Sequence, residues 1–398
     1  MVPLNLKNYF DKIVLVIGAG ASREMGCKLS QGMLVDLGES INNLSPVDKP
    51  YYEFRVEFSE IYKFIMASLH YQSTMKAPLD GNPTEVNIED FVFVLRQLID
   101  KEYIVPYPLI GNWNEKITKW ELKNQDLFQI FLNFTIYLLV TKWTEFNLAS
   151  AIDQYKPVLD LLHSSENIVL NVFSLNYDLV LEKVFNTATS RVLDNGFSEK
   201  TIDNQLIKYW AADFANDQNK TKINLYKLHG SIDWVYKKES ESIVMKENIY
   251  DNQEPLIIYG SSTKMLSFDP FLFFLSKFRE YLEKSTVFIV IGYSFHDKYI
   301  NNMLIQQVNQ NTETQLPKKM LIVGPNEKET ESSFSEKIKK IQESKSINDV
   351  INFRSVSPER LMIINKTAKD FFQEYFADSG KKLIEIFDSI SKSGEHFT

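Results

Sequence analysis

Short runs of consecutive apolar residues recur along this chain, and each run ends in small or polar residues before a helical pattern begins. The first and most regular run is Ile13–Ile17. Later runs of the same kind lie at residues 168–173, 223–228, 286–291 and 320–323. Apolar runs without alternation are typical of strands that are buried on both faces of a parallel sheet. The pattern therefore predicts an α/β fold, with a Rossmann-like doubly wound parallel sheet.

A turn of small residues, Gly18-Ala19-Gly20-Ala21-Ser22, follows the first run directly. Apolar residues then recur every four positions from Leu29 to Ile41, which predicts an amphipathic helix. Because glycines lack Cβ atoms, the N–H groups of such a turn can approach a phosphate at the positive end of a helix. The dehydrogenase fingerprint would place a third glycine at Arg23, whereas the next glycine is Gly26. The turn predicts a nucleotide site without naming the nucleotide; the alternative is a turn needed only to pack the strand against the helix.

The middle of the chain has a different pattern from its beginning. Residues 44–166 contain periodic helical segments and no run that resembles a strand, so we expect a helical insertion there. We place the Rossmann domain at residues 1–43 and 167–326, and a mainly helical C-terminal region at residues 327–398. Residues 235–270 are polar and are expected to be irregular.

Composition narrows the class of protein. The formal net charge is −8, so direct binding to nucleic acid is not expected. Cys27 is the only cysteine, which excludes an intrachain disulfide and a Cys₄ or Cys₂His₂ zinc site. The N-terminal residues have no signal-peptide pattern, and the most apolar segment, Leu127–Thr141, is too short to span a bilayer and fits a buried core helix. We therefore expect a cytoplasmic protein that does not enter a membrane.

Polar side chains follow several of the predicted strands. Asn176 and Asp178 come after the second run, His229 comes after the third, and Gly292 and Ser294 come after the fourth. The carboxyl ends of parallel strands meet at one edge of a sheet, where ligands bind near the point at which strand order reverses. We therefore expect these residues to share that edge with the glycine turn.

An amide, a carboxylate and a histidine suit the cleavage of an N-glycosidic bond whose leaving group is a nicotinamide. That leaving group departs as a neutral molecule, so it needs no acid of the kind that glycosidases use. Asn176 could position the ribose and a water, and His229 could accept a proton from a ribose hydroxyl. The alternatives stay open: His229 could be structural, and Asn176 and Asp178 could cap the following helix.

The motifs, taken in order, resemble the sirtuin-like family. They are the glycine turn with Gly26, then Ser174–Asp178, then Leu228-His229-Gly230, and then Gly292-Tyr293-Ser294. The resemblance implies an NAD-binding Rossmann-like domain with Asn176 and His229 as catalytic residues, supported by Asp178. The residues implied to hold the ADP-ribose part of NAD are Gly18, Ala19, Gly20, Ala21, Ser22, Gly26, Gly292 and Ser294.

Departures from the deacetylating sirtuins indicate a particular branch. Gly26 is followed by Cys27-Lys28-Leu29-Ser30 where those enzymes have Ile-Pro-Asp-Phe-Arg, their Cys₄ zinc module is impossible here, and Tyr177 stands where they have isoleucine. The chain resembles the bacterial antiphage-defence branch, which hydrolyses NAD to nicotinamide and ADP-ribose. Too few residues follow Asn326 for the C-terminal sensing domain of the Thoeris effector. A stand-alone subunit paired with a HerA-type hexameric ATPase is the nearer resemblance, which implies a homo-oligomer that uses NAD⁺ as substrate and holds no zinc.

Two other functions remain as alternatives. One is an NAD-dependent protein deacylase or ADP-ribosyltransferase, against which the missing zinc module counts. The other is a module that senses NAD or ADP-ribose without turnover, which would need neither Asn176 nor His229.

Overall fold

The structure is a computed structural model of the 398-residue chain. It describes residues 6–76, 86–101, 113–164, 168–188, 193–202, 205–214, 222–238, 240–250, 253–259, 268–310, 317–324, 356 and 358–394.

A parallel sheet of seven strands forms the centre of the α/β part of the molecule. Its strands lie in the order β11-β10-β9-β1-β2-β6-β3, and all of the neighbouring pairs are parallel. The order runs outward from β1 in both directions, so it reverses between β1 and β9, as in a doubly wound fold. This confirms the predicted fold class. The strands are β1 Ile13–Ile17, β2 Val169–Ser174, β3 Leu193–Asp194, β6 Lys222–Lys227, β9 Val287–Ile291, β10 Lys319–Val323 and β11 Leu361–Ile364.

Helices cover both faces of this sheet, because the side chains of each strand alternate between two apolar clusters. On β1, Ile13, Leu15 and Ile17 pack in one cluster, whereas Val14 and Val16 pack in the other. The first face is covered by α7 Leu148–Ser164, α8 Val180–Ala188, α12 Ala368–Tyr375 and α13 Ala377–Gly394, with the short α1 Leu6–Phe10 beside them. The second face is covered by α9 Phe271–Lys284 and α10 Lys298–Asn309.

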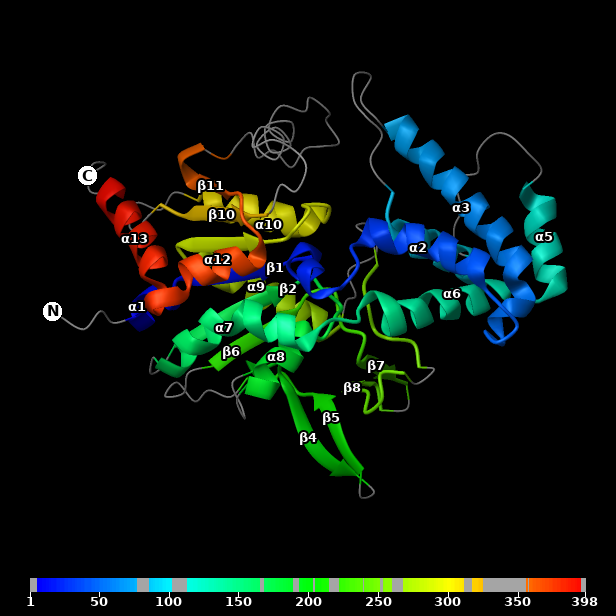
Figure 1. The fold of residues 1–398 in the computed structure, drawn as a ribbon, viewed down its shortest axis with the longest axis horizontal. Helices are drawn as coiled ribbons and strands as arrows, with labels where there is room; N and C mark the ends of the chain where they lie inside the picture. Colours follow the sequence, from blue (N-terminus) through cyan, green and yellow to red (C-terminus); the bar gives the residue numbers. More distant parts are fainter. Residues whose placement is uncertain are drawn as a thin grey trace.

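A helical block with its own apolar core lies beyond the carboxyl ends of the strands (Figure 1). The rings of Phe58 and Phe131 stack in that core with centroids 4.5 Å apart. As predicted, the segment that begins at Leu127 is a buried helix, and it ends in a π-helical turn, Leu139–Trp143. The block consists of that turn with α2 Ser30–Asn43, the 3₁₀ helix Tyr51–Phe54, α3 Arg55–Lys76, α4 Ile88–Asp100, α5 Trp113–Lys123 and α6 Leu127–Leu138.

Packing groups α2 with the helical block and α7 with the sheet, since their buried side chains belong to those cores. The domain boundaries placed at residues 43 and 166 from the sequence stay a prediction.

A second, antiparallel sheet of four strands lies in the order β4-β5-β8-β7. The expectation of irregular structure at residues 235–270 is wrong for two of its strands, and β11 adds a strand to the mainly helical tail. These strands were missed because they are short, and in this sheet β4, β5 and β7 carry charged residues among the apolar ones. Their bounds are β4 Phe197–Ile202, β5 Gln205–Trp210, β7 Trp234–Lys237 and β8 Ser242–Met245.

No single helix in the described ranges is long and apolar enough to cross a bilayer. The bent pair Leu127–Trp143 and Leu148–Ser164 passes on length and composition alone, and most of its apolar side chains are buried in the two cores.

Candidate functional site

The glycine turn after β1 packs directly on the backbone that follows β9. The N–H of Gly20 donates to the carbonyl of Gly292 over 2.8 Å. A Cβ atom on Gly18 would lie 2.6 Å from the Gly292 oxygen, and one on Gly292 would lie 2.2 Å from the nitrogen of Ala21. Gly292 also has a φ of +62°, a conformation that favours glycine. These glycines therefore allow two backbones to touch at the point where strand order reverses.

Most of the N–H groups expected to hold a phosphate already donate to carbonyl groups of the chain. Gly18 donates to Ile291 and Gly20 to Gly292, while Ala21 and Ser22 close 3₁₀ turns by donating to Gly18 and Ala19. Instead of one long helix, the turn leads into two short 3₁₀ helices, and α2 begins at Ser30. The contacts support the alternative in which the glycines serve packing, and a role of this turn in binding stays a prediction.

The remaining predicted binding residues lie at the surface. Ala19 and Ser294 are exposed, the latter beside Gly292. Gly26 is also exposed; it ends the second 3₁₀ helix with a φ of +113° and faces the carbonyl of Glu145. Gly26 is therefore explained by the left-handed turn that it makes.

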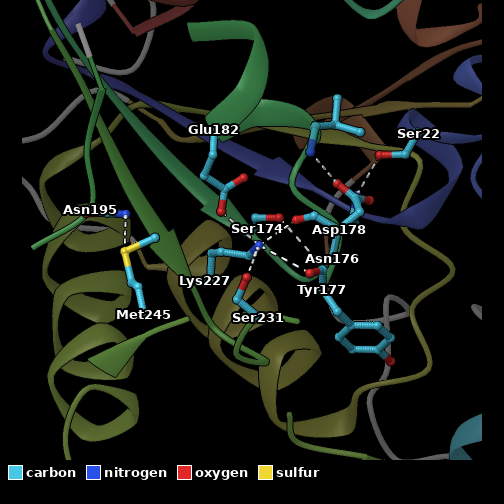
Figure 2. Close-up of polar contacts among 11 residues, drawn as sticks. Ser22, Ser174, Asn176, Tyr177, Asp178, Glu182, Asn195, Lys227, Ser231 and Met245 are labelled. Atoms are coloured by element: carbon cyan, nitrogen blue, oxygen red, sulfur yellow. Dashed lines mark hydrogen bonds and ion pairs between the residues drawn. The ribbon is translucent and has the colours of Figure 1, made fainter. Parts of the chain in front are cut away.

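Asn176 is buried between the ends of β1 and β2, with 6% of its surface exposed. Its Nδ2 donates to the Ser22 hydroxyl over 3.1 Å (Figure 2). The same nitrogen donates to the carbonyl of Gly18 over 3.2 Å. A carbonyl can only accept, which fixes the amide nitrogen on that side. Oδ1 is buried and has no hydrogen-bond partner among the described residues. An unpaired buried amide oxygen is costly, and a hydroxyl of a ligand would satisfy it.

His229 lies at the end of β6 and is paired with an acid from another element. Its Nε2 is 2.9 Å from Oδ2 of Asp297, whose Oδ1 caps α10 by accepting the N–H groups of Tyr299 and Ile300. Burial disfavours the charged imidazole, but the bond to Asp297 and the charges of Glu89 and Asp297 outweigh it and raise the pKa of His229. Burial likewise opposes the charge of Asp297, and the bond to His229 prevails and lowers the pKa of that carboxyl. Cap and histidine together thus orient one carboxylate.

Asp178 is engaged at the start of α8. Its Oδ1 accepts the N–H of Val180 over 3.0 Å, and only 7% of the residue is exposed. Burial, and secondarily the charge of Asp178, raise the pKa of the Cys27 thiol. This geometry supports the capping explanation, and a supporting role in catalysis stays a prediction.

Lys227, which sequence reasoning missed, lies almost fully buried beneath the same loops (Figure 2). Its Nζ donates to Glu182 over 2.9 Å, to the carbonyl of Asp178 over 2.5 Å and to the Ser231 hydroxyl over 2.7 Å. The available signal was a charged residue at the end of an apolar run, immediately before Leu228-His229.

The helical block reaches the carboxyl edge of the sheet through α4. The Tyr177 hydroxyl donates to Glu89, in the first turn of that helix. Burial, followed by the charge of Glu89, raises the pKa of Tyr177 well above its usual value. Arg96, two turns along α4, lies over the ring of Tyr259 at 5.3 Å and pairs with Glu254. The block therefore contacts the residue next to Asn176.

Among the residues that the structure describes, no group of three or more His, Cys, Asp and Glu side chains could hold a metal ion. A hollow of about 490 Å³ lies between α7 and the junction of α12 and α13, and its lining includes Asp160, Phe376 and Ser379. That hollow is formed by elements other than the strand ends that carry Asn176 and His229.

Comparison with known proteins gives one family match. The SIR2-like domain model matches residues 170–346, which is less than half of the chain. The matched range contains Asn176, Asp178, His229, Gly292 and Ser294, whereas the glycine turn after β1 lies before it. The match supports the sirtuin-like resemblance over these residues. No curated protein matches the chain.

Solved structures of sirtuins align with the whole chain at low similarity. An ADP-ribose complex of a Sir2 homologue variant has 13% identity and a TM-score of 0.38, with 97% of this chain and 98% of that chain covered. A structure concerned with sirtuin substrate affinity has 12% identity and a TM-score of 0.36, with coverage of 93% and 95%. Values this low do not establish a shared function.

Proposed function

With a SIR2-like match over residues 170–346 as the premise, we propose that this protein uses NAD⁺ and hydrolyses its nicotinamide–ribose bond to nicotinamide and ADP-ribose. The observation that carries the proposal is the unpaired, buried Oδ1 of Asn176, on the strand end next to the one that bears His229. The N–H of Leu228, next to His229, donates to the carbonyl of Ser174 over 2.9 Å, which brings the histidine beside the Asn176 loop.

The reaction does not require a general acid to protonate the leaving group. When the bond between C1′ and the pyridinium nitrogen breaks, its electron pair neutralises the nicotinamide, and positive charge develops on the ribose. A water then bonds to C1′ and gives up a proton. The protein must hold the ribose, place the water and accept that proton.

The residues at the carboxyl edge match these tasks. Asn176 Oδ1 would accept a hydrogen bond from a ribose hydroxyl, which gives this buried oxygen a partner. Nδ2 would keep its hydrogen bonds to the Gly18 carbonyl and the Ser22 hydroxyl. His229 in its neutral form would accept the proton, with Asp297 holding the ring and stabilising the imidazolium that results. The contact with Asp297 raises the pKa of His229 and therefore raises the pH above which the histidine can act as a base.

The biological setting follows from the sequence resemblance. In that proposal the protein is a cytoplasmic antiphage-defence effector that depletes NAD⁺. It would work as a homo-oligomer and be controlled by a HerA-type ATPase, because an unrestrained NAD⁺ hydrolase would harm a healthy cell.

The proposal is tested by measuring nicotinamide and ADP-ribose released from NAD⁺ by the purified chain, alone and with a HerA-type ATPase. Asn176→Ala should lower turnover by at least about 10²-fold, as loss of a positioning contact does. Asn171→Ala is the matched control, because Asn171 is a buried amide on the same strand that bonds Asn224 rather than lining the carboxyl edge. Its turnover per folded molecule should stay near that of the wild type.

Three outcomes would contradict the proposal. Equal product release by Asn176→Ala and the wild type would show that Asn176 is not part of a catalytic site. Stoichiometric deacylation of an acyl-lysine peptide would indicate a deacylase. A folded protein whose melting temperature rises with ADP-ribose, and which releases no product with or without the ATPase, would be a sensor.

A further inference from the structure

We infer that Lys227 is a positioning residue that holds the loop of Asn176 and the loop of His229 at a fixed separation. Its side chain is 2% exposed and lies between the two loops (Figure 2). On one side Nζ donates to the carbonyls of Tyr177 and Asp178, over 3.4 and 2.5 Å. On the other side it donates to the Ser231 hydroxyl over 2.7 Å.

The backbone around Lys227 joins the same two loops but leaves their ends to the side chain. Ser174 pairs with Lys227 in the parallel ladder, and Leu228 donates to the carbonyl of Ser174 over 2.9 Å. Beyond the ladder, the N–H of Ile232 donates to the carbonyl of Tyr177 over 3.1 Å. Nζ of Lys227 donates to the same Tyr177 carbonyl, so the ammonium group connects the two loops beyond the last paired residues of the strands.

A lysine suits this place because its ammonium group offers three donors that point in different directions, and the longer 3.4 Å contact to the Tyr177 carbonyl shares one of them. Glu182 on α8 supplies the countercharge over 2.9 Å, which allows the cation to be buried. Neither charged group is placed to touch a substrate in the geometry described for Asn176 and His229. Lys227 therefore acts through the backbone that carries those two side chains.

The inference rests on the proposed function, and it predicts a particular kinetic change. Lys227→Met removes the link but leaves the carboxylate of Glu182 buried without a countercharge. A second variant, Lys227→Met with Glu182→Leu, therefore replaces the ion pair by an apolar pair. In this double variant kcat should fall about 10²-fold, since small misplacement of reacting groups has effects of that size. The Kd for ADP-ribose should change less than about threefold, because the contacts that bind it are retained.

Lys318 provides a matched control. It is another buried lysine, and its Nζ donates to the carbonyls of Leu282 and Glu283 over 2.7 and 2.6 Å. It precedes β10, so it lies at the opposite edge of the sheet from the strand ends that carry the site. Lys318→Met should lower the melting temperature while kcat per folded molecule stays within about threefold of the wild type.

The experiment measures kcat, the Kd for ADP-ribose, the melting temperature and amide hydrogen exchange for these variants. Faster exchange at residues 174–178 and 228–232 of the double variant, together with the loss of kcat, supports the inference. Unchanged exchange there, or a kcat that falls no further than in Lys318→Met, overturns it. If the wild type releases no nicotinamide, the proposed function fails, and the exchange measurement still decides whether Lys227 links the loops.

Discussion

Gly292→Ala should destabilise the protein by about 1 to 2.5 kcal/mol, because the added methyl group meets backbone rather than a movable side chain. The φ of +62° at this position alone costs an alanine about 1–2 kcal/mol. The new Cβ would lie 2.2 Å from the nitrogen of Ala21 and 2.8 Å from the Cα of Gly20, so the two turns must separate. Separation breaks the 2.8 Å bond from Gly20 to Gly292, at a cost of about 1 kcal/mol. Reduced freedom of the unfolded chain returns about 0.4–1 kcal/mol.

The assay is urea unfolding followed by tryptophan fluorescence and circular dichroism. Gly32→Ala serves as the control, because a Cβ there meets nothing within 4 Å and the residue lies in α2. That variant should be unchanged or more stable by up to about 1 kcal/mol. A loss below about 1 kcal/mol for Gly292→Ala would refute the reasoning, since the turns would then not be in the contact described.

The remaining predictions concern two carboxylates, the partly exposed Asp297 and the buried Asp36. Asp297→Asn removes the charge that raises the pKa of His229, so the acidic limb of the pH–rate profile should move to lower pH. The maximal rate should also fall, because the imidazole ring is less well oriented. A limb that does not move, or that moves to higher pH, would exclude His229 as a base whose pKa Asp297 raises. Burial opposes ionisation of Asp36, but hydrogen bonds from Lys142, Trp143 and Lys28 prevail and lower its pKa far below the usual range. Its folded pKa is depressed, so its stabilising contribution is present above the unfolded pKa of about 3.9 and is lost as the pH falls below it. Unfolding measured between about pH 5 and pH 2 should therefore be less pH-dependent in Asp36→Asn than in the wild type, and equal dependence would contradict the assignment.

The sequence predicted the parts of the fold that depend on local pattern. Five apolar runs matched strands of the main sheet, because burial on both faces leaves an uninterrupted apolar signature. The antiparallel sheet was not predicted, because β4 and β5 are short strands that mix charged and apolar residues, and loops show the same pattern.

The candidate site could be predicted only as far as single strand ends reveal it. Asn176 and His229 were recognisable because each follows an apolar run, but their partners come from elsewhere in the chain. Asp297 caps the start of α10 through one oxygen, and its second oxygen turns to His229 for reasons that only the packing of α10 shows. The direction in which Lys227 points is likewise set by α8 and Ser231, not by its neighbours in sequence.

The position of β1 in the sheet has a consequence for how the protein is made. This strand is synthesised before the other strands of the sheet, yet Val14 pairs with Asn171 on one side and with Phe288 on the other. The helices of the helical block end at Trp143 and also precede both neighbours, although the core of the block includes later residues such as Tyr177. During synthesis this fully apolar strand therefore remains unpaired until its neighbours are made, and an unpaired apolar strand is prone to aggregation. Chaperone dependence should then be concentrated in the interval before residues 169–174 and 287–291 emerge, and fragments ending between these two segments should be recovered mainly as insoluble protein.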